Sequence, residues 1–120
     1  DYRPKQVAKE KIKKNDESMN LSLIKNPDII SKVAALTKKP FTVGFAAETA
    51  NVNDNANKKL NSKNLNMIIS NDVSDKTIGF DSDDNEVHVI TENETIFLKK
   101  DKKIKIAREI LNIIALNIKS

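Results

Sequence analysis

The sequence has no cysteine among its 120 residues. A disulfide framework, a thiolate metal site and a cysteine nucleophile are therefore excluded, and the absence fits a reducing compartment. No apolar run approaches the roughly eighteen residues of a membrane-spanning helix, and residues 1–4 lack the apolar stretch of a signal peptide. We expect a soluble, cytoplasmic protein with no membrane partner.

Aromatic residues and arginine are scarce. Aromatics make up 4% of the chain, and two of its 21 basic residues are arginine. Surfaces that stack on bases or read their edges consist mostly of these residue types. The net charge of +4 arises from basic residues interspersed with 17 acidic ones, whereas a nucleic-acid binder needs a contiguous basic face. We expect no nucleic-acid partner.

The first forty residues predict little regular structure. A chain of this length buries one core, so we expect one domain over residues 1–120. Polar residues 2–18 predict a loop or a short irregular helix, and Leu21–Ile24 a short strand. Asn26 and Pro27 then offer a cap and a first helical residue, followed by the acidic Asp28. Helical spacing follows in a set of apolar residues that ends before Pro40: Ile29, Ile30, Val33, Ala34 and Leu36.

The remaining residues alternate between strand and helix patterns. Phe41–Ala47 is an apolar run too short for a helix and predicts an interior parallel strand buried on both faces. Residues 51–64 predict a helix, residues 67–69 a buried strand and residues 73–85 a loop. Two further strands, 86–91 and 94–98, predict a hairpin. A final helix carries isoleucines at four-residue steps: Ile106, Ile110, Ile114 and Ile118.

This order of elements predicts an α/β fold. We expect a layered, mostly parallel, Rossmann-like sheet with helices on both faces and a C-terminal antiparallel hairpin. The chain opens in a polar segment with no first strand and no glycine-rich turn. We therefore expect that the first strands are missing and that residues 1–120 are the C-terminal portion of a larger domain.

Two lysines stand out on the helix expected at 51–64. Its apolar stripe is Val52, Ala56 and Leu60, and at about 100° per residue Lys59 and Lys63 fall within about 20° of Val52. Both lysines lie on or beside the inward stripe. Their stems could simply cover the edge of the apolar surface. Alternatively, because like charges at this spacing repel, an anion such as a phosphate or a nucleotide could lie between them.

Three other features carry weaker signals. The lysine-rich segment 9–14 is either a solvated charge run or a flap that closes on an anionic substrate. The acidic loop 81–85 lacks the spacing and the distal glutamate of a calcium loop, so we expect a turn. His88 has no serine, cysteine or second histidine that could complete a catalytic triad, and we interpret it as structural.

Specific sequence blocks follow one another in order along nearly the whole chain. The most specific are Gly44-Phe45-Ala46-Ala47-Glu48-Thr49 and Ser70-Asn71-Asp72-Val73, and others begin at Asp1, Lys11, Lys25, Lys63 and Gly79. Together they resemble the phosphopantothenoylcysteine synthetase family. In most bacteria this synthetase is fused behind a flavin-dependent decarboxylase, and the two perform consecutive steps of coenzyme A biosynthesis.

The resemblance implies a CTP-dependent ligase that joins 4′-phosphopantothenate to L-cysteine. The carboxylate attacks the α-phosphate of CTP to give an acyl-cytidylate and pyrophosphate, and the cysteine amine then displaces CMP. It further implies Mg²⁺, a homodimer, and FMN only in a fused decarboxylase domain outside this chain. CTP rather than ATP follows from the bacterial type of the resemblance.

The resemblance also assigns site residues. Lys11 is the catalytic candidate, a flap lysine that neutralises charge at the reacting phosphate. Nucleotide contacts fall on Asp1, Lys11, Pro27, Asp28, Ile29, Ile30, Phe45, Lys59 and Lys63, and no residue is assigned to a metal. Asn66 departs from the aspartate usual in the family. The glycine-rich phosphate loop and an asparagine that engages the phosphopantothenate belong to the part that we expect to be missing.

A second interpretation stays open beside the enzyme. The chain could be a non-catalytic structural or dimerisation module of a bifunctional coenzyme A biosynthesis protein, with the hairpin at 86–98 pairing with a second copy. The enzyme interpretation instead predicts that Lys59, Lys63 and Phe45 meet the nucleotide on one side of the sheet.

Overall fold

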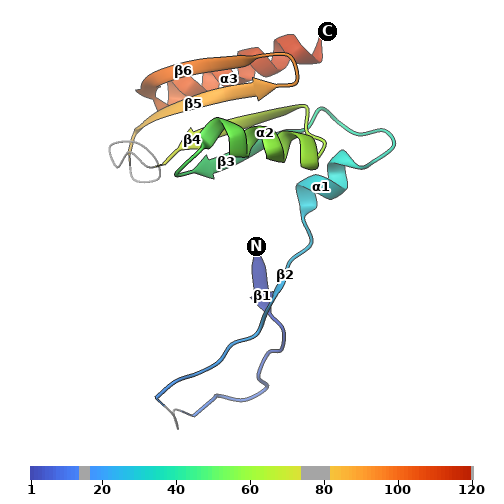
Figure 1. The fold of residues 1–120 in the computed structure, drawn as a ribbon, viewed down its shortest axis with the longest axis vertical. Helices are drawn as coiled ribbons and strands as arrows, with labels where there is room; N and C mark the ends of the chain where they lie inside the picture. Colours follow the sequence, from blue (N-terminus) through green and yellow to red (C-terminus); the bar gives the residue numbers. More distant parts are fainter. Residues whose placement is uncertain (14–16, 74–81, 120) are drawn as a thin grey trace.

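The computed structural model describes residues 1–13, 17–73 and 82–119 (Figure 1). Strands and helices alternate through the middle of the chain, and a long helix ends it. In chain order, the elements of the described residues are β1 (Tyr2–Pro4), β2 (Leu23–Lys25), α1 (Ile29–Ala34), β3 (Val43–Glu48), α2 (Val52–Ser62), β4 (Met67–Asp72), β5 (Asp84–Thr91), β6 (Thr95–Lys102) and α3 (Lys103–Ile118).

The larger sheet has the strand order β3-β4-β5-β6. β3 and β4 run parallel, with Val43 opposite Met67, and α2 connects them. β5 is antiparallel to both β4 and β6, and it forms the predicted hairpin with β6. The α/β fold with a C-terminal hairpin is therefore confirmed. Among the described strands of this sheet, parallel pairing is confined to β3 and β4, so the sheet is more antiparallel than the alternating pattern predicted.

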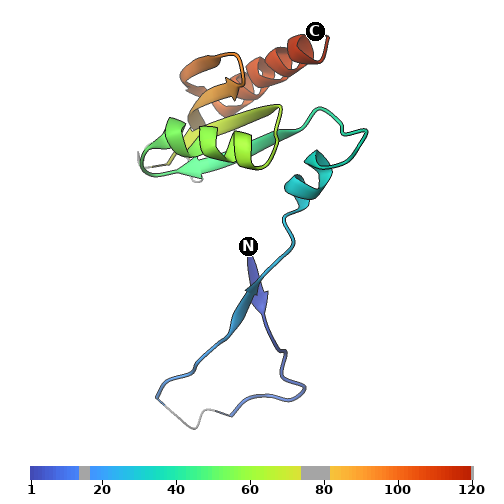
Figure 2. The same ribbon diagram turned by 45° about the vertical axis from the view of Figure 1, so that its right-hand side comes forward.

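Helices cover both faces of the sheet, as predicted (Figure 2). Successive residues of a strand point to opposite faces, so each strand contributes to two clusters. On one face, α2 packs through Ala56 and Leu60 against Ala46, Ile68 and Ile90. On the other face, α3 packs against β4 and β5 in a cluster that contains Met67, Ile69, Val87, Val89, Ile106 and Ile110. The expected apolar stripes are confirmed at Ala56 and Leu60 of α2 and at Ile106, Ile110 and Ile114 of α3, whereas Ile118 is exposed.

The N-terminal strands form a separate ribbon that extends away from the main sheet (Figure 1). β1 and β2 pair antiparallel, with Tyr2 opposite Lys25, and neither strand has a buried residue. The prediction of a loop or irregular helix is wrong for Tyr2–Pro4, because the partner strand that fixes these residues lies about twenty residues downstream. The strand expected at Leu21–Ile24 is present, shifted to Leu23–Lys25.

α1 starts later and ends earlier than its pattern predicts. Asp28, in an extended conformation, precedes the first helical residue Ile29, and its side chain makes no capping hydrogen bond to the backbone. Pro27 therefore lies outside the helix, where its ring also disfavours helical geometry at Asn26. The helix ends at Ala34, well before Pro40.

β3 is an edge strand of the described sheet, in contrast to the interior strand that we predicted. It pairs with β4 alone among the described strands. Its exposure alternates, with Gly44 and Ala46 buried and Phe45 69% exposed. An apolar run shows that both faces of a strand are apolar. Whether each face is buried depends on which other elements pack against it.

Candidate functional site

A hollow of about 650 Å³ lies where the N-terminal ribbon, α1 and the end of α2 meet. It is lined by Asp1, Tyr2, Lys25, Asn26, Pro27, Asp28, Ile29, Ile30 and Lys63. Six of the nine predicted nucleotide contacts are among these residues, although they come from segments up to sixty residues apart in the sequence. The lining combines two carboxylates with two ammonium groups and two isoleucines, a mixture that suits a ligand with both charged and apolar parts.

An ion pair joins the two sides of this hollow. The Lys63 ammonium lies 2.8 Å from a carboxylate oxygen of Asp28, which also accepts a 2.8 Å hydrogen bond from the Ser31 hydroxyl. Hydrogen bonding to Lys63, and then to Ser31, lowers the pKa of Asp28 from 3.8 to about 2. Asp28 therefore stays ionised throughout the neutral range. Because its carboxylate is negatively charged, it does not itself bind a phosphate.

α1 is held on the sheet by a small number of contacts. The Asn64 side-chain amide donates to the Ala34 carbonyl at 3.1 Å, and Asn64 lies just beyond α2 with a positive φ of 56°. The Lys39 ammonium donates to the Asn64 carbonyl at 2.8 Å. Ile30 packs over Gly44, where an added Cβ would lie 3.4 Å from the Ile30 Cδ1 methyl group. These contacts fix the wall of the hollow that α1 provides.

Asn66, which stands where the family usually has aspartate, is hydrogen-bonded to the backbone of Thr42. Its side-chain oxygen accepts a 2.9 Å hydrogen bond from the Thr42 backbone N–H, and its own backbone N–H donates to the Thr42 carbonyl at 3.0 Å. An amide oxygen serves this acceptor role as a carboxylate would. The substitution therefore leaves the start of β3 tied to the start of β4.

Lys59 lies one turn before Lys63 on α2 and has its own acidic partner. Its ammonium lies 2.7 Å from the Glu48 carboxylate at the end of β3. The side chain of Lys59 is 44% exposed, whereas that of Glu48 is 14% exposed. Both lysines are thus half-buried beside the inward stripe, as predicted, and each is held by a carboxylate from a different element.

Phe45 does not share a side of the sheet with the two lysines, so that prediction is wrong. Phe45 is opposite Ile69 in the β3–β4 register, and Ile69 belongs to the cluster under α3. Phe45 lines an apolar groove of about 460 Å³ together with residues of α3 such as Ile106 and Leu111. The strand alternation that buries Gly44 and Ala46 on the face covered by α1 and α2 directs Phe45 to the other face.

Lys11 lies in the exposed connection between β1 and β2, outside the lining of the hollow. Lys9 and Lys13 are exposed as well, and Lys14 falls outside the described residues. Lys11, the catalytic candidate, therefore lies in the connection between β1 and β2 and does not line the hollow.

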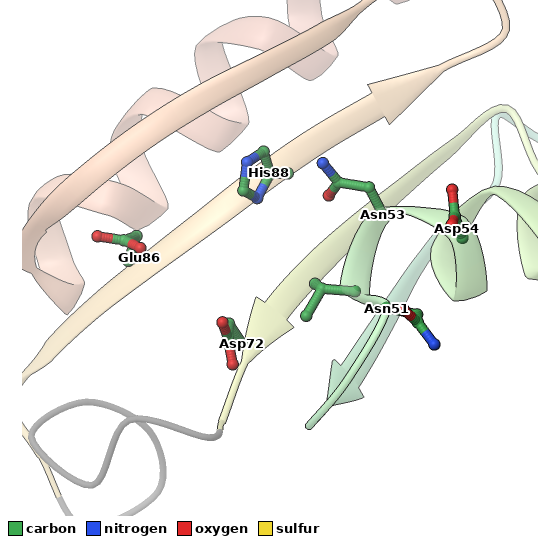
Figure 3. A pocket seen from close by; sticks show the side chains of 7 residues that line it. Asn51, Asn53, Asp54, Asp72, Glu86 and His88 are labelled. Carbon is green, nitrogen blue, oxygen red and sulfur yellow. The ribbon is translucent and has the colours of Figure 1, made fainter.

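A second, polar hollow of about 290 Å³ lies near the start of α2 (Figure 3). Asn51, just before α2, lines it together with Asn53 and Asp54 of α2, and Asp72, Glu86 and His88 line it from the sheet. The His88 ring stacks on Phe97 with a centroid separation of 4.8 Å, which agrees with a structural histidine. Within the described ranges, no three histidine or acidic side chains are arranged to hold a metal ion.

The acidic segment at 81–85 can be assessed in part. Asp81 is outside the described residues, as is the loop around Gly79. The Ser82 hydroxyl accepts a 3.1 Å hydrogen bond from the Asp84 N–H, the kind of local bond that stabilises a turn. Asp84 and Asn85 already belong to β5.

Among the described helices, none is long and apolar enough to cross a bilayer.

Several residues close to Lys59 and Lys63 were not predicted from the sequence. Tyr2, Lys25 and Asn26 line the hollow because β1 pairs with β2, a pairing that the polar sequence did not reveal. The sequence assigns no functional role to Glu48, which it places just after the predicted strand 41–47. Its position in the Gly-Phe-Ala-Ala-Glu-Thr block, directly after a buried strand, was the available signal.

Comparison with known proteins agrees with the geometry. The chain is 48% identical over 113 residues to the coenzyme A biosynthesis bifunctional protein CoaBC of Haemophilus influenzae, which covers 93% of this chain and 28% of that protein. The protein of the same name from Escherichia coli is 45% identical over 107 residues, 86% of this chain and 26% of its own length. The chain thus spans less than a third of these curated relatives.

Solved structures show the same fold. The crystal structure of the C-terminal domain of a coenzyme A biosynthesis bifunctional protein CoaBC matches with a TM-score of 0.75 and 34% identity, over 99% of this chain and 50% of that one. A DNA/pantothenate metabolism flavoprotein from Streptococcus pneumoniae matches with a TM-score of 0.70 and 26% identity, over 89% of this chain and 46% of that one.

The family assignment rests on nearly the whole length of the chain. Residues 1–117 match the family described as the DNA/pantothenate metabolism flavoprotein C-terminal domain. The relatives named above are coenzyme A biosynthesis proteins, and the resemblance noted in the sequence is to the synthetase part of such proteins. This chain therefore belongs to the DNA/pantothenate metabolism flavoprotein C-terminal domain family, the C-terminal part of bifunctional coenzyme A biosynthesis proteins.

Proposed function

We propose that this chain is the nucleotide-binding part of a CTP-dependent ligase that joins 4′-phosphopantothenate to L-cysteine in coenzyme A biosynthesis. The observation that supports this most directly is the hollow shared by Asp1, residues 27–30 and Lys63. These positions were assigned to the nucleotide from sequence blocks alone. Binding of one ligand by these positions requires that the three separate segments converge, as they do here.

The chemistry requires positive charge at such a site. A carboxylate is a poor electrophile, so it must be activated by transfer of a cytidylyl group before an amine can attack it. The attacking carboxylate and the triphosphate both carry negative charge, and lysines lower the barrier by compensating the charge where it develops. We assign Lys63 and Lys59 to binding of the phosphates, and Lys11 to the reacting phosphate when the connection between β1 and β2 that carries it approaches the hollow.

Magnesium is compatible with this arrangement. Mg²⁺ in nucleotide sites takes one or two protein carboxylates and fills its other positions with phosphate oxygens and water. Asp1 and Asp28 are among the lining residues and carry such oxygens, so they would hold the ion. The bound ion would neutralise charge on the phosphates, and the protein residues would orient them.

The proposal extends to the assembly. We propose a cytoplasmic homodimer, in a protein that also carries a decarboxylase domain, with residues 1–120 as the C-terminal portion of the synthetase domain. The outer edge of β6 has no strand partner among the described residues, and such an edge is available to a second copy. As a structural module alone, the chain would still dimerise but would contribute nothing to nucleotide affinity.

The test is a ligation assay on the full-length protein that contains these residues. CMP release from CTP should depend on both 4′-phosphopantothenate and L-cysteine. Lys63→Ala should raise the KM for CTP by about tenfold or more, since it removes a charge-assisted contact. Lys102→Ala, which removes a lysine paired with Asp84 at 3.2 Å on the hairpin, is the matched control. A protein that folds but releases no CMP would refute the ligase.

A further inference from the structure

Glu48 is the least exposed charged side chain in the ion pairs around α2. It ends β3, and its own carbonyl accepts a 3.0 Å hydrogen bond from the Val73 N–H, which ties it to the strand beside it. Its side chain is 14% exposed, and a carboxylate so far withdrawn from water is stabilised by a charged, hydrogen-bonded partner. Lys59 supplies that partner at 2.7 Å.

The two ends of this pair differ in a way that suits a ligand. The acid is fixed and largely buried, whereas the lysine side chain is 44% exposed. A lysine ammonium has three donors, so the hydrogen bond to Glu48 leaves two for another acceptor. The pair at Lys63 is built differently, because its acid Asp28 is 45% exposed.

The direction of Lys59 also fits this role. Long side chains on a helix lean toward its N-terminus, and α2 starts just after β3 ends. The Lys59 ammonium is thereby carried to Glu48 at the carboxyl end of β3. In open α/β sheets, ligands bind outside the carboxyl ends of the strands.

We propose that Glu48 is a positioning residue that holds the Lys59 ammonium at the carboxyl end of β3 for an anionic group of the nucleotide. The inference rests on the proposed function. A free lysine side chain samples many rotamers and loses that freedom on binding an anion. Glu48 removes most of this cost before the ligand arrives, so its effect should reach the nucleotide only through Lys59.

A double-mutant cycle in the full-length protein tests this. Glu48→Gln keeps the shape but removes the charge, and should raise the KM for CTP about fivefold while kcat changes by less than about twofold. In a Lys59→Ala background the same substitution should change the KM by less than about 1.5-fold. Asp84→Asn, which unpairs Lys102 on the hairpin, is the control and should leave the KM unchanged.

Other results would overturn the assignment. A lower KM in Glu48→Gln would mean that the carboxylate competes with the nucleotide for Lys59. An unchanged KM, or an equal rise with and without Lys59, would reduce Glu48 to a structural residue. If Glu48→Gln does not fold, Glu48→Asp keeps the charge and shortens the reach by one methylene, and it should raise the KM in the same way.

A labelling experiment separates this inference from the proposed function because it needs no nucleotide. Acetylation of lysines by a water-soluble N-hydroxysuccinimide ester is followed at each lysine by peptide mass spectrometry. Glu48→Gln should speed the acetylation of Lys59 severalfold relative to Lys102, since the Lys59 ammonium is released from its acceptor. An unchanged rate of Lys59 acetylation would overturn the positioning role. The expected faster acetylation in a protein that does not use CTP would refute the ligase alone.

Discussion

The sheet with α3 and the region around α1 are stabilised by different interactions. β4, β5 and α3 share a continuous cluster of buried aliphatic side chains. α1 buries one residue, Ala34, and is otherwise held by single contacts to Asn64, Lys63 and the start of β3. The ribbon beyond α1 has no buried residue. Stability therefore resides in one region, and the candidate nucleotide site in the other.

This difference predicts how each region responds to change. Loss of a buried methyl group in the cluster costs free energy of unfolding, because both burial and packing are lost. Around the hollow, removal of a charge or a shift of α1 changes the geometry offered to a ligand, at a smaller cost in stability. Regions of low local stability are also those that rearrange most easily when a ligand binds.

The largest effect on stability is expected for Ile69→Ala. Ile69 is fully buried in the cluster under α3, and removing three of its carbons should lower the free energy of unfolding by about 2–5 kcal/mol. Urea denaturation followed by circular dichroism measures this. Ile104→Ala, at a residue of α3 that is 66% exposed, is the control and should cost far less. Equal losses in the two variants would contradict the proposed location of the core.

A smaller effect is expected for Gly44→Ala, which joins the two regions. The new Cβ would lie 2.7 Å from the Leu65 Cδ1 methyl group and 3.4 Å from Ile30 on α1. Leu65 must move and α1 must adjust, which should cost about 1–2 kcal/mol of unfolding free energy. In the full-length protein the KM for CTP should rise as well, because α1 forms a wall of the hollow.

A double variant checks the cause of that effect. Gly44→Ala combined with Leu65→Ala removes the clashing methyl group, so the loss of stability should be smaller than the sum of the two single losses. Strictly additive losses would mean that the new methyl group does not meet Leu65.

Much of the sheet could be predicted because its signals are local. The four-residue spacing of isoleucines defined α3, and Val52, Ala56 and Leu60 defined α2, since in both helices one face meets the sheet. The hairpin followed from two short strand patterns separated by a polar turn. These elements make the contacts that their own sequences indicate.

The rest depended on distant partners. β1 is polar and exposed, and its pairing with Lys25 is decided by chain more than twenty residues away. Phe45 was assigned to the wrong side because an apolar run does not reveal which neighbour covers which face. The phase of Lys59 and Lys63 could be calculated, but their acidic partners could not, since Glu48 and Asp28 lie outside α2.

The ion pair between Asp28 and Lys63 in the hollow should break as the pH is lowered. Because the pKa of Asp28 is lowered from 3.8 to about 2, its contribution to stability is present above pH 3.8 and is lost as the pH falls toward 2. NMR titration of the Asp28 carboxyl carbon should give a midpoint near 2. In Lys63→Ala the midpoint should rise, since Lys63 is the main cause of the shift. An unchanged midpoint would show that the pair does not form in solution.

The smallest effect is expected for Asp101→Asn, which breaks an ion pair that lies in neither the buried cluster nor the hollow. Asp101 and Lys105 are one helical turn apart at the junction of β6 and α3, 2.9 Å from each other, and Lys105 is largely exposed. Their hydrogen bond lowers the pKa of Asp101 and raises that of Lys105, yet exposed pairs of this kind gain little because water screens them. The midpoint of thermal unfolding and the KM for CTP should both stay at their wild-type values. A change in KM as large as that of Glu48→Gln would mean that any lost carboxylate perturbs nucleotide binding, and the specific role of the acids around α2 would then fail.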